Sequence, residues 1–244
     1  MLYCSKIKKS LMNKLIVVTG GTKGIGRAIL EKFASLDFDV VTCARNKDGL
    51  DKLKAAFENK GTSAQVFQAD MSDREQVLAF AKFVNSLDRP VDVLVNNAGF
   101  FRPGLVTDEP DGVLENTINS NLYSAYYTTR GLVGQMKKTR TGHIFNMCSI
   151  ASIKAYPNGG SYAISKFALL GFSKVLREEL KEYGIRVTAI MPGATRTASW
   201  DGVELPDDRF MSVEDVAEAV YSVYALSGRS VVEEMIIRPQ LGDI

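Results

Sequence analysis

Short runs of apolar residues alternate with longer stretches of helical periodicity along most of the chain. A short, continuous apolar run bounded by polar or turn residues is typical of a strand buried on both faces of a sheet. This pattern predicts strands at residues 15–18, 39–43, 64–69, 91–95, 143–148, 186–191 and 231–237. Apolar side chains at helical spacing predict helices at residues 24–36, 49–59, 72–87, 111–138, 162–183 and 213–226.

The alternation of strand and helix continues to the end of the chain, which predicts an α/β fold with a parallel sheet and helices on both faces. Right-handed crossovers would make this sheet doubly wound. Ser72 and Glu75 have the spacing of a capping box, so Ser72 is expected to be the N-cap of its helix. No repeat or composition break marks a second domain, and residues 13–244 are interpreted as one domain. Residues 1–12 are interpreted as an N-terminal extension, with Met12 as an alternative start.

Composition and charge exclude several classes of protein. The net charge of +2 is too small to indicate binding to nucleic acid or to an anionic membrane. Three cysteines without a CxxC motif argue against a disulfide framework, and one histidine gives no metal site. No apolar run is long enough for a transmembrane helix, and the first residues lack a signal peptide's apolar stretch. We therefore expect a cytoplasmic protein.

A glycine-rich turn, TGGTKGIG at residues 19–26, lies between the first predicted strand and the first predicted helix. Glycine permits a tight turn and a close approach of backbone N–H groups to a phosphate, and the positive end of the following helix attracts that charge. Ordinary strand–helix connections can also be rich in glycine. The position of the turn at the start of an alternating chain favours dinucleotide binding.

Further motifs follow this turn along the chain. They are NNAG at residues 96–99, Asn121, Ser149, YxxxK at residues 162–166, and PG at residues 192–193 with Thr197. Together with the TGxxxGxG spacing of the turn, this series resembles the short-chain dehydrogenase/reductase family from about Lys14 to the C-terminus. The resemblance implies a single-domain Rossmann-type fold, a nicotinamide dinucleotide cofactor and the interconversion of a carbonyl and an alcohol.

The same resemblance implies the residues of the site. Catalytic roles fall on Asn121, Ser149, Tyr162 and Lys166, with Asn121 holding a water that connects Lys166 to solvent. The cofactor-binding residues are expected to be Gly20, Thr22, Lys23, Gly24, Ile25, Gly26, Arg45, Asp70, Met71, Asn97, Ala98, Gly99, Tyr162, Lys166, Pro192, Gly193, Thr195 and Thr197.

The YxxxK motif has a chemical rationale of its own. Tyr162 and Lys166 share one face of the predicted helix. A tyrosine pKa of about 10 is too high for efficient proton transfer near neutral pH, and a nearby ammonium group lowers it. Ser149 can hydrogen-bond the substrate oxygen beside Tyr162. These roles favour an NADP(H)-dependent oxidoreductase that reduces a carbonyl, with Tyr162 as the proton donor.

Three other interpretations remain. YxxxK alone could be an exposed tyrosine and lysine on an amphipathic helix. The enzyme could be an alcohol dehydrogenase that works in the oxidative direction. The chain could also be a non-catalytic NADP(H)-binding sensor, which predicts a damaged catalytic set, whereas Ser149, Tyr162 and Lys166 are all present. The single histidine, His143, begins a predicted strand without a partner in sequence and is assigned a structural or surface role.

The end of the second predicted strand favours NADPH over NADH. A carboxylate there would bind the ribose hydroxyls of NADH and repel a 2′-phosphate. Ala44 occupies that place, and Arg45 follows it. Arg45 and Lys23 could bind the phosphate through charge-assisted hydrogen bonds, or could be solvated surface cations.

The substrate and the assembly are less constrained. Residues after strand ends are candidates for the substrate pocket, although each could be ordinary packing: Phe100, Phe101, Arg102, Tyr156, Pro157, Trp200 and Met211. A short segment at residues 195–210 predicts an open pocket and a small or planar substrate. The C-terminal end resembles the bacterial sepiapterin-reductase-like branch, which suggests a pterin or another dicarbonyl side chain. The family resemblance implies a homodimer or homotetramer formed through helices 111–138 and 162–183.

Overall fold

The central strands bury side chains on both faces, so both faces of the sheet need a cover of helices. In β1 (Leu15–Thr19), Ile16 and Val18 face one core while Leu15 and Val17 face the other. The structure is a computed structural model that describes residues 13–244. The interpretation of residues 1–12 as an extension lies outside this range.

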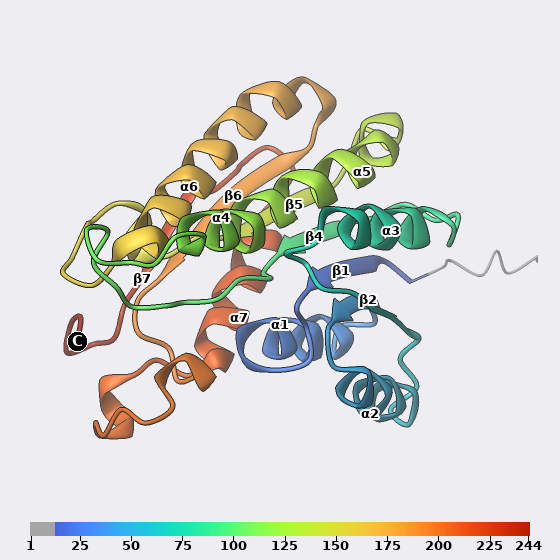
Figure 1. Cartoon of the computed structure of the whole chain (residues 1–244). Helices are drawn as coiled ribbons and strands as arrows, with labels where there is room; N and C mark the ends of the chain where they lie inside the picture. Colours follow the sequence, from blue (N-terminus) through green and yellow to red (C-terminus); the bar gives the residue numbers. More distant parts are fainter. Residues whose placement is uncertain (1–12) are drawn as a thin grey trace, which may run out of the picture.

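Seven parallel strands form one sheet in the order β3-β2-β1-β4-β5-β6-β7 (Figure 1). The strands after β1 are β2 (Asp39–Ala44), β3 (Ala64–Gln68), β4 (Val93–Asn96), β5 (His143–Met147), β6 (Arg186–Pro192) and β7 (Glu234–Ile237). The order reverses between β1 and β4, which makes the sheet doubly wound and opens a crevice at the carboxyl ends of these strands. The predicted fold class is confirmed.

Helices lie on both faces of the sheet (Figure 1). One face is covered by α1 (Gly24–Ala34), α2 (Lys47–Glu58) and α7 (Val213–Tyr224). The other face is covered by α3 (Arg74–Asn85), α4 (Val113–Ile118), α5 (Ser124–Thr139) and α6 (Gly160–Leu180). Short helical turns add η1 (Asn119–Tyr123), η2 (Ile150–Ser152), η3 (Lys181–Tyr183), η4 (Ala198–Trp200) and η5 (Asp207–Arg209).

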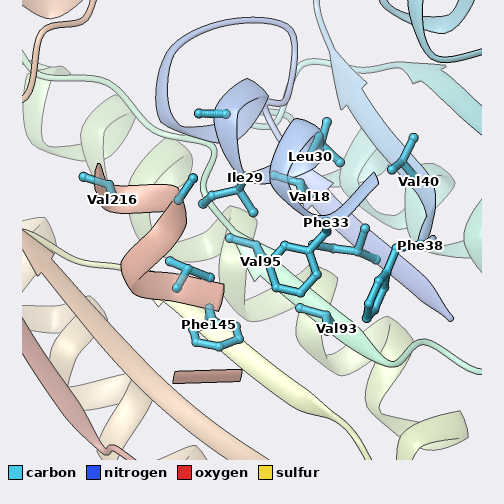
Figure 2. Packing of buried hydrophobic residues seen from close by; sticks show 14 of the residues in the cluster. Val18, Ile29, Leu30, Phe33, Phe38, Val40, Val93, Val95, Phe145 and Val216 are labelled. Carbon is cyan, nitrogen blue, oxygen red and sulfur yellow. The ribbon is translucent and has the colours of Figure 1, made fainter. Parts of the chain in front are cut away.

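The core under α1 and α7 is built around Phe33, which is fully buried against the sheet (Figure 2). Its ring meets Phe38 and Tyr224 edge to face, with centroids 5.1 and 5.4 Å apart. Burying one such side chain stabilises the fold by about 1.5–3 kcal/mol. This packing fixes α1 against β1, and so fixes the glycine-rich turn that joins them.

Two details of the helices differ from the sequence-based expectation. The N-cap of α3 is Asp73, whose carboxylate accepts hydrogen bonds from the amides of Glu75 and Gln76, so the assignment of Ser72 is wrong. Ser72 instead donates to Asp70 from both its amide and its hydroxyl. The helix expected at residues 111–138 begins at Val113, and the π-helical turn η1 interrupts it at Asn119–Tyr123.

Candidate active site

The glycine-rich turn leaves the first amides of α1 free to bind a ligand. The N-cap residue, Lys23, makes no side-chain hydrogen bond to that helix. Gly20 and Gly24 have positive φ values of 72° and 56°. A Cβ on Gly26 would lie 2.5 Å from Asn97 Nδ2 and 2.6 Å from the Gly20 oxygen, so only glycine fits there. Uncapped amides in a turn built for close approach suit the phosphates of a dinucleotide.

Side chains from β1, from β2 and from the residue after β4 hold this turn in place. Asn97 Nδ2 donates to the carbonyls of Thr19 and Gly20 over 2.9 and 3.1 Å. Thr19 Oγ1 accepts from the amides of Asn97 and Ala98. Thr42 Oγ1 accepts from the Gly21 amide over 3.0 Å. Sequence reasoning missed Thr19 and Thr42, although a threonine at or near the end of an apolar strand was the available signal.

Ser149, Tyr162 and Lys166 come together at the carboxyl end of β5. The Ser149 side chain lies close enough to Tyr162 to lower the pKa of its hydroxyl. Lys166 Nζ lies 5.7 Å from the centroid of the Tyr162 ring and donates to the Met147 carbonyl over 2.7 Å. Ser149 is the N-cap residue of η2, and its Oγ accepts a hydrogen bond from the Ala151 amide. A hydroxyl pair with an adjacent buried ammonium group can orient a carbonyl oxygen and exchange a proton with it.

Burial controls the pKa values of this group. It raises the pKa of Tyr162 to about 12, although the nearby Ser149 side chain acts in the opposite direction. It lowers the pKa of Lys166 to about 8. The expectation that the pKa of Tyr162 is lowered is therefore not met in this structure, because desolvation of the phenolate is the largest influence on it.

Asn121 lies in the π-helical turn η1, and all of its side-chain hydrogen bonds are made within the protein. Its Oδ1 accepts from the Phe100 amide, and its Nδ2 donates to the Phe100 carbonyl and to Ser165 Oγ. A Cβ on Gly99 would lie 2.7 Å from Asn121 Oδ1 and 3.9 Å from Lys166 Nζ. Both Nδ2 hydrogens of Asn121 are therefore used within the protein, and its Oδ1 keeps one free lone pair.

The remaining predicted cofactor residues follow the carboxyl ends of the strands. Arg45 and Lys23 are exposed. The side chain of Met71 is buried, with its sulfur 3.3 Å from the sulfur of Cys43. Only the backbone of Met71 is therefore available to hydrogen-bond a cofactor. Thr195 donates to the Gly193 carbonyl. Thr197 approaches the glycine-rich turn, since its Cγ2 would lie 3.4 Å from a Cβ on Gly24.

A cleft of about 560 Å³ opens beside Tyr162, within the usual size range of small-molecule sites. It is lined by four of the predicted substrate residues, Phe101, Tyr156, Pro157 and Trp200, and by six of the predicted cofactor residues, Ile25, Tyr162, Pro192, Gly193, Thr195 and Thr197. Phe100 and Arg102 do not line it, and Met211 is buried in the core that α7 covers.

The C-terminal residues Asp243 and Ile244 also line this cleft, which sequence reasoning did not predict. Asp243 lies near Lys154 and Arg238, with closest nitrogen–oxygen distances of 4.0 and 3.6 Å. Its carbonyl accepts from Arg209. The chain end therefore contributes one wall of the cleft.

Other candidates for chemistry lie apart from this cleft or are enclosed. His143 is fully buried at the amino end of β5, where Nε2 lies 2.7 Å from Thr188 Oγ1. This supports the structural role assigned to it. Cys43 and Cys148 are free thiols, both buried. Across residues 13–244, no cluster of His, Cys, Asp and Glu could hold a metal. Within the same range, no helix combines the length and apolar character needed to cross a membrane.

Comparison with known proteins identifies the family. The sequence profile described as short chain dehydrogenase matches residues 14–206. The chain belongs to this family, as its motifs predicted. It is 33% identical over 241 residues to a sepiapterin reductase from Chlorobaculum tepidum, an alignment that covers 96% of this chain and 99% of the relative. It is 28% identical over 208 residues to a diacetyl reductase from Staphylococcus epidermidis, covering 85% of this chain and 80% of the relative.

Solved structures agree with this assignment. An alcohol dehydrogenase from Thermococcus sibiricus, complexed with 5-hydroxy-NADP, has a TM-score of 0.88 and 26% identity, covering 95% of this chain and 98% of its own. An L-sorbose reductase from Gluconobacter frateurii, complexed with NADPH and L-sorbose, has a TM-score of 0.86 and 27% identity. That match covers 93% of this chain and 95% of the reductase.

Proposed function

We propose that this protein is an NADP(H)-dependent oxidoreductase that reduces a carbonyl to an alcohol, with Tyr162 as the proton donor. The observation that carries the proposal is that Ser149 and Tyr162 line one cleft while Lys166 Nζ lies beside the Tyr162 ring. An intact set of these side chains argues against a non-catalytic sensor.

The chain's own residues fit the proposed cofactor. The uncapped start of α1 and the glycines around it suit the phosphates, and Arg45 and Lys23 suit a 2′-phosphate. When bound, the nicotinamide supplies the hydride. Pro192 and Gly193 at the end of β6 and Thr195 and Thr197 after it would hold that end of the cofactor against the cleft. The solved relatives that carry 5-hydroxy-NADP and NADPH support this choice.

The three side chains divide the remaining work. Ser149 orients the carbonyl oxygen of the substrate by a hydrogen bond. Tyr162 donates its hydroxyl proton to that oxygen as negative charge develops on it. Lys166 places a positive charge close to the tyrosinate that is left. We assign to Asn121 the water that connects Lys166 to solvent and returns a proton.

The pKa of Tyr162 favours reduction over oxidation. With a pKa of about 12, the tyrosine is protonated near neutral pH and can act as an acid. Oxidation of an alcohol would require the tyrosinate as a base. We therefore infer that the alcohol dehydrogenase activity is the weaker direction near neutral pH and rises as the pH increases.

The lining of the cleft supports a small, planar, uncharged substrate. Phe101, Tyr156 and Trp200 provide aromatic surface, and Lys154 and Asp243 are paired with each other near the chain end. The sepiapterin reductase and the diacetyl reductase among the relatives both point to vicinal dicarbonyl or pterin side-chain chemistry. A panel of sepiapterin, diacetyl and other α-diketones, followed by NADPH absorbance, would identify the substrate.

The decisive variant is Tyr162→Phe. Loss of the proton donor should reduce kcat by about 10²–10⁴-fold, because general acid catalysis contributes that much. NADPH affinity, measured by fluorescence titration, should stay nearly unchanged. Tyr156→Phe is the matched control, since it removes a hydroxyl from the same cleft and should alter the KM of the carbonyl rather than kcat. Turnover by Tyr162→Phe within a few-fold of the wild type would overturn the proposal.

The proposal also covers the oligomeric state, the cellular compartment and the kind of partner. We infer a homodimer or homotetramer, because exposed apolar side chains on α6 leave a face without a partner in the monomer. Buried free thiols suit the reducing cytoplasm. The small net charge supports a small-molecule partner rather than nucleic acid or a membrane.

A further inference from the structure

We propose that Glu109 is a positioning residue for the proton donor: its carboxylate caps the catalytic helix α6 from a distant loop and so fixes the place of Tyr162. This inference rests on the proposed function. It concerns the segment at residues 99–112, between β4 and α4, which in Figure 1 runs close to the segment before α6.

The start of α6 has no cap of its own. The N-cap residue is Gly159, which has no side chain, and no local hydrogen bond replaces it. Glu109 fills this role from 52 residues away in sequence, since its Oε1 accepts from the Ser161 amide over 3.0 Å. Its Oε2 accepts from the Ser161 hydroxyl. Ser161 is buried, so its hydroxyl needs an acceptor within the protein.

Two glycines leave room for this carboxylate. A Cβ on Gly104 would lie 2.9 Å from Glu109 Oε1, and a Cβ on Gly160 would lie 2.2 Å from the same atom. The backbone of Gly104 also pairs with the chain just before α6, because its amide donates to the Asn158 carbonyl over 3.1 Å. The loop and the helix start therefore form one unit around Glu109.

This unit lies directly beside Tyr162. Ser161, which Glu109 holds, is the residue immediately before Tyr162. The same loop carries Phe101, whose ring meets the Tyr162 ring edge to face with centroids 4.9 Å apart. The Glu109 contact thus ties together the helix that carries the tyrosine and the loop that packs against its ring. A small displacement of a catalytic group can cost up to about 10²-fold in rate.

The test compares Glu109→Ala, Glu109→Gln and the control Asp108→Asn. Asp108 is the adjacent acidic residue, is exposed, and makes no side-chain contact among the hydrogen bonds and ion pairs of residues 13–244. We expect Glu109→Ala to lower kcat by about ten- to a hundredfold with little change in NADPH affinity. Glu109→Gln should recover part of the loss, because its amide oxygen can still accept from Ser161. Asp108→Asn should match the wild type.

Two readouts separate positioning from a purely structural role. The solvent deuterium isotope effect on kcat should increase in Glu109→Ala, because a misplaced Tyr162 makes proton transfer limit the rate more. A lower fraction of folded enzyme would leave that ratio unchanged. Amide hydrogen exchange, which needs no substrate, should increase in residues 101–112 and 159–166 of both Glu109 variants and stay at the wild-type level elsewhere.

The possible results are distinct. Wild-type exchange in both segments of Glu109→Ala, or a wild-type kcat and isotope effect, would overturn the positioning role. Reduced kcat with an unchanged isotope effect would also overturn it and would assign Glu109 to folding alone. If Tyr162→Phe is fully active, the proposed function itself fails, whatever Glu109 does. If Glu109→Ala does not fold, the same measurements are compared between Glu109→Gln and the wild type.

Discussion

The two residues at the end of β2 decide which dinucleotide the site should prefer. Ala44 places no carboxylate beside the adenosine ribose, and the exposed Arg45 follows it. Each hydrogen bond to a charged group contributes about 1.5–3 kcal/mol. Because Arg45 and Lys23 are exposed, solvent screening brings their contributions toward the lower end of this range. We expect NADPH to be preferred over NADH by about 10²-fold or more.

The measurement is kcat/KM for each cofactor with one active carbonyl. Arg45→Ala should weaken the use of NADPH with little effect on NADH, and Ala44→Asp should shift preference toward NADH. Lys47→Ala is a suitable control, because Lys47 is a nearby exposed cation that is paired with Asp51. Equal values for both cofactors in the wild type would contradict this prediction.

His143 should make the protein less stable in mild acid. Burial lowers its pKa from 6.5 to about 2, so the folded protein keeps the ring neutral while the unfolded chain binds a proton below pH 6.5. Its contribution to stability is therefore complete above about pH 6.5 and is lost as the pH falls. The expected loss is about 1.4 kcal/mol for each pH unit.

Urea unfolding between pH 7.5 and pH 4.5 tests this prediction. The chain has no other histidine, so no second imidazole titrates in this range. His143→Gln keeps a group able to bond Thr188 and removes the titration. It should be less stable at pH 7.5 but should lose stability less steeply toward pH 5. Parallel curves for the variant and the wild type would show that His143 does not carry the effect.

Residues in short motifs could be predicted from the sequence, and residues defined by a distant contact could not. Ser149, Tyr162 and Lys166 have a spacing and residue types that indicate their chemistry. Thr19, Thr42 and Glu109 have no such signal, because their importance depends on partners far away in the chain. The pKa of Tyr162 was predicted in the wrong direction, since sequence reveals the nearby lysine but not the burial.

At the scale of elements, apolar periodicity predicted the seven strands and the helices between them, but not the division of residues 111–138 into α4 and α5 or the details of element ends. Asp73 rather than Ser72 caps α3, because both residues favour that position and the backbone decides between them. The spacing of apolar residues gives no sign of the π-helical turn at Asn119–Tyr123. This turn contains the predicted catalytic residue Asn121. Such turns are frequently found at functional sites.

The outer face of α6 should bury itself against a second copy of the chain. Ile164, Phe167 and Val175 lie on this face with 42%, 46% and 55% of their surface exposed. Gly171, between them, leaves open space for a close approach of another helix. A two-fold axis through such a face would give a closed dimer, which is the common outcome for soluble oligomers.

Light scattering coupled to size exclusion tests this prediction at micromolar concentration. The wild type should be a dimer or tetramer, and Phe167→Glu should shift it toward smaller species. Leu78→Glu places the same charge on the exposed surface of α3 and should leave the assembly unchanged. A wild-type monomer would remove the basis for this interface.

At the scale of the whole molecule, the parallel sheet explains why motifs far apart in sequence form one site. All carboxyl ends of the strands lie along one edge, and the order reverses between β1 and β4. The glycine-rich turn, NNAG, Ser149 and the PG segment each follow a strand at this edge. Strand order could therefore predict the meeting of the motifs, whereas the walls of the cleft depend on loops without periodicity.

The wall formed by Asp243 and Ile244 has a practical consequence for handling the protein. Any residues joined after Ile244, such as a purification tag, would emerge beside the substrate cleft and could compete with substrate for it. The start of β1 lies at the opposite, amino end of the parallel strands, away from the cleft (Figure 1). Fusion partners and surface-immobilisation handles therefore belong at the amino end.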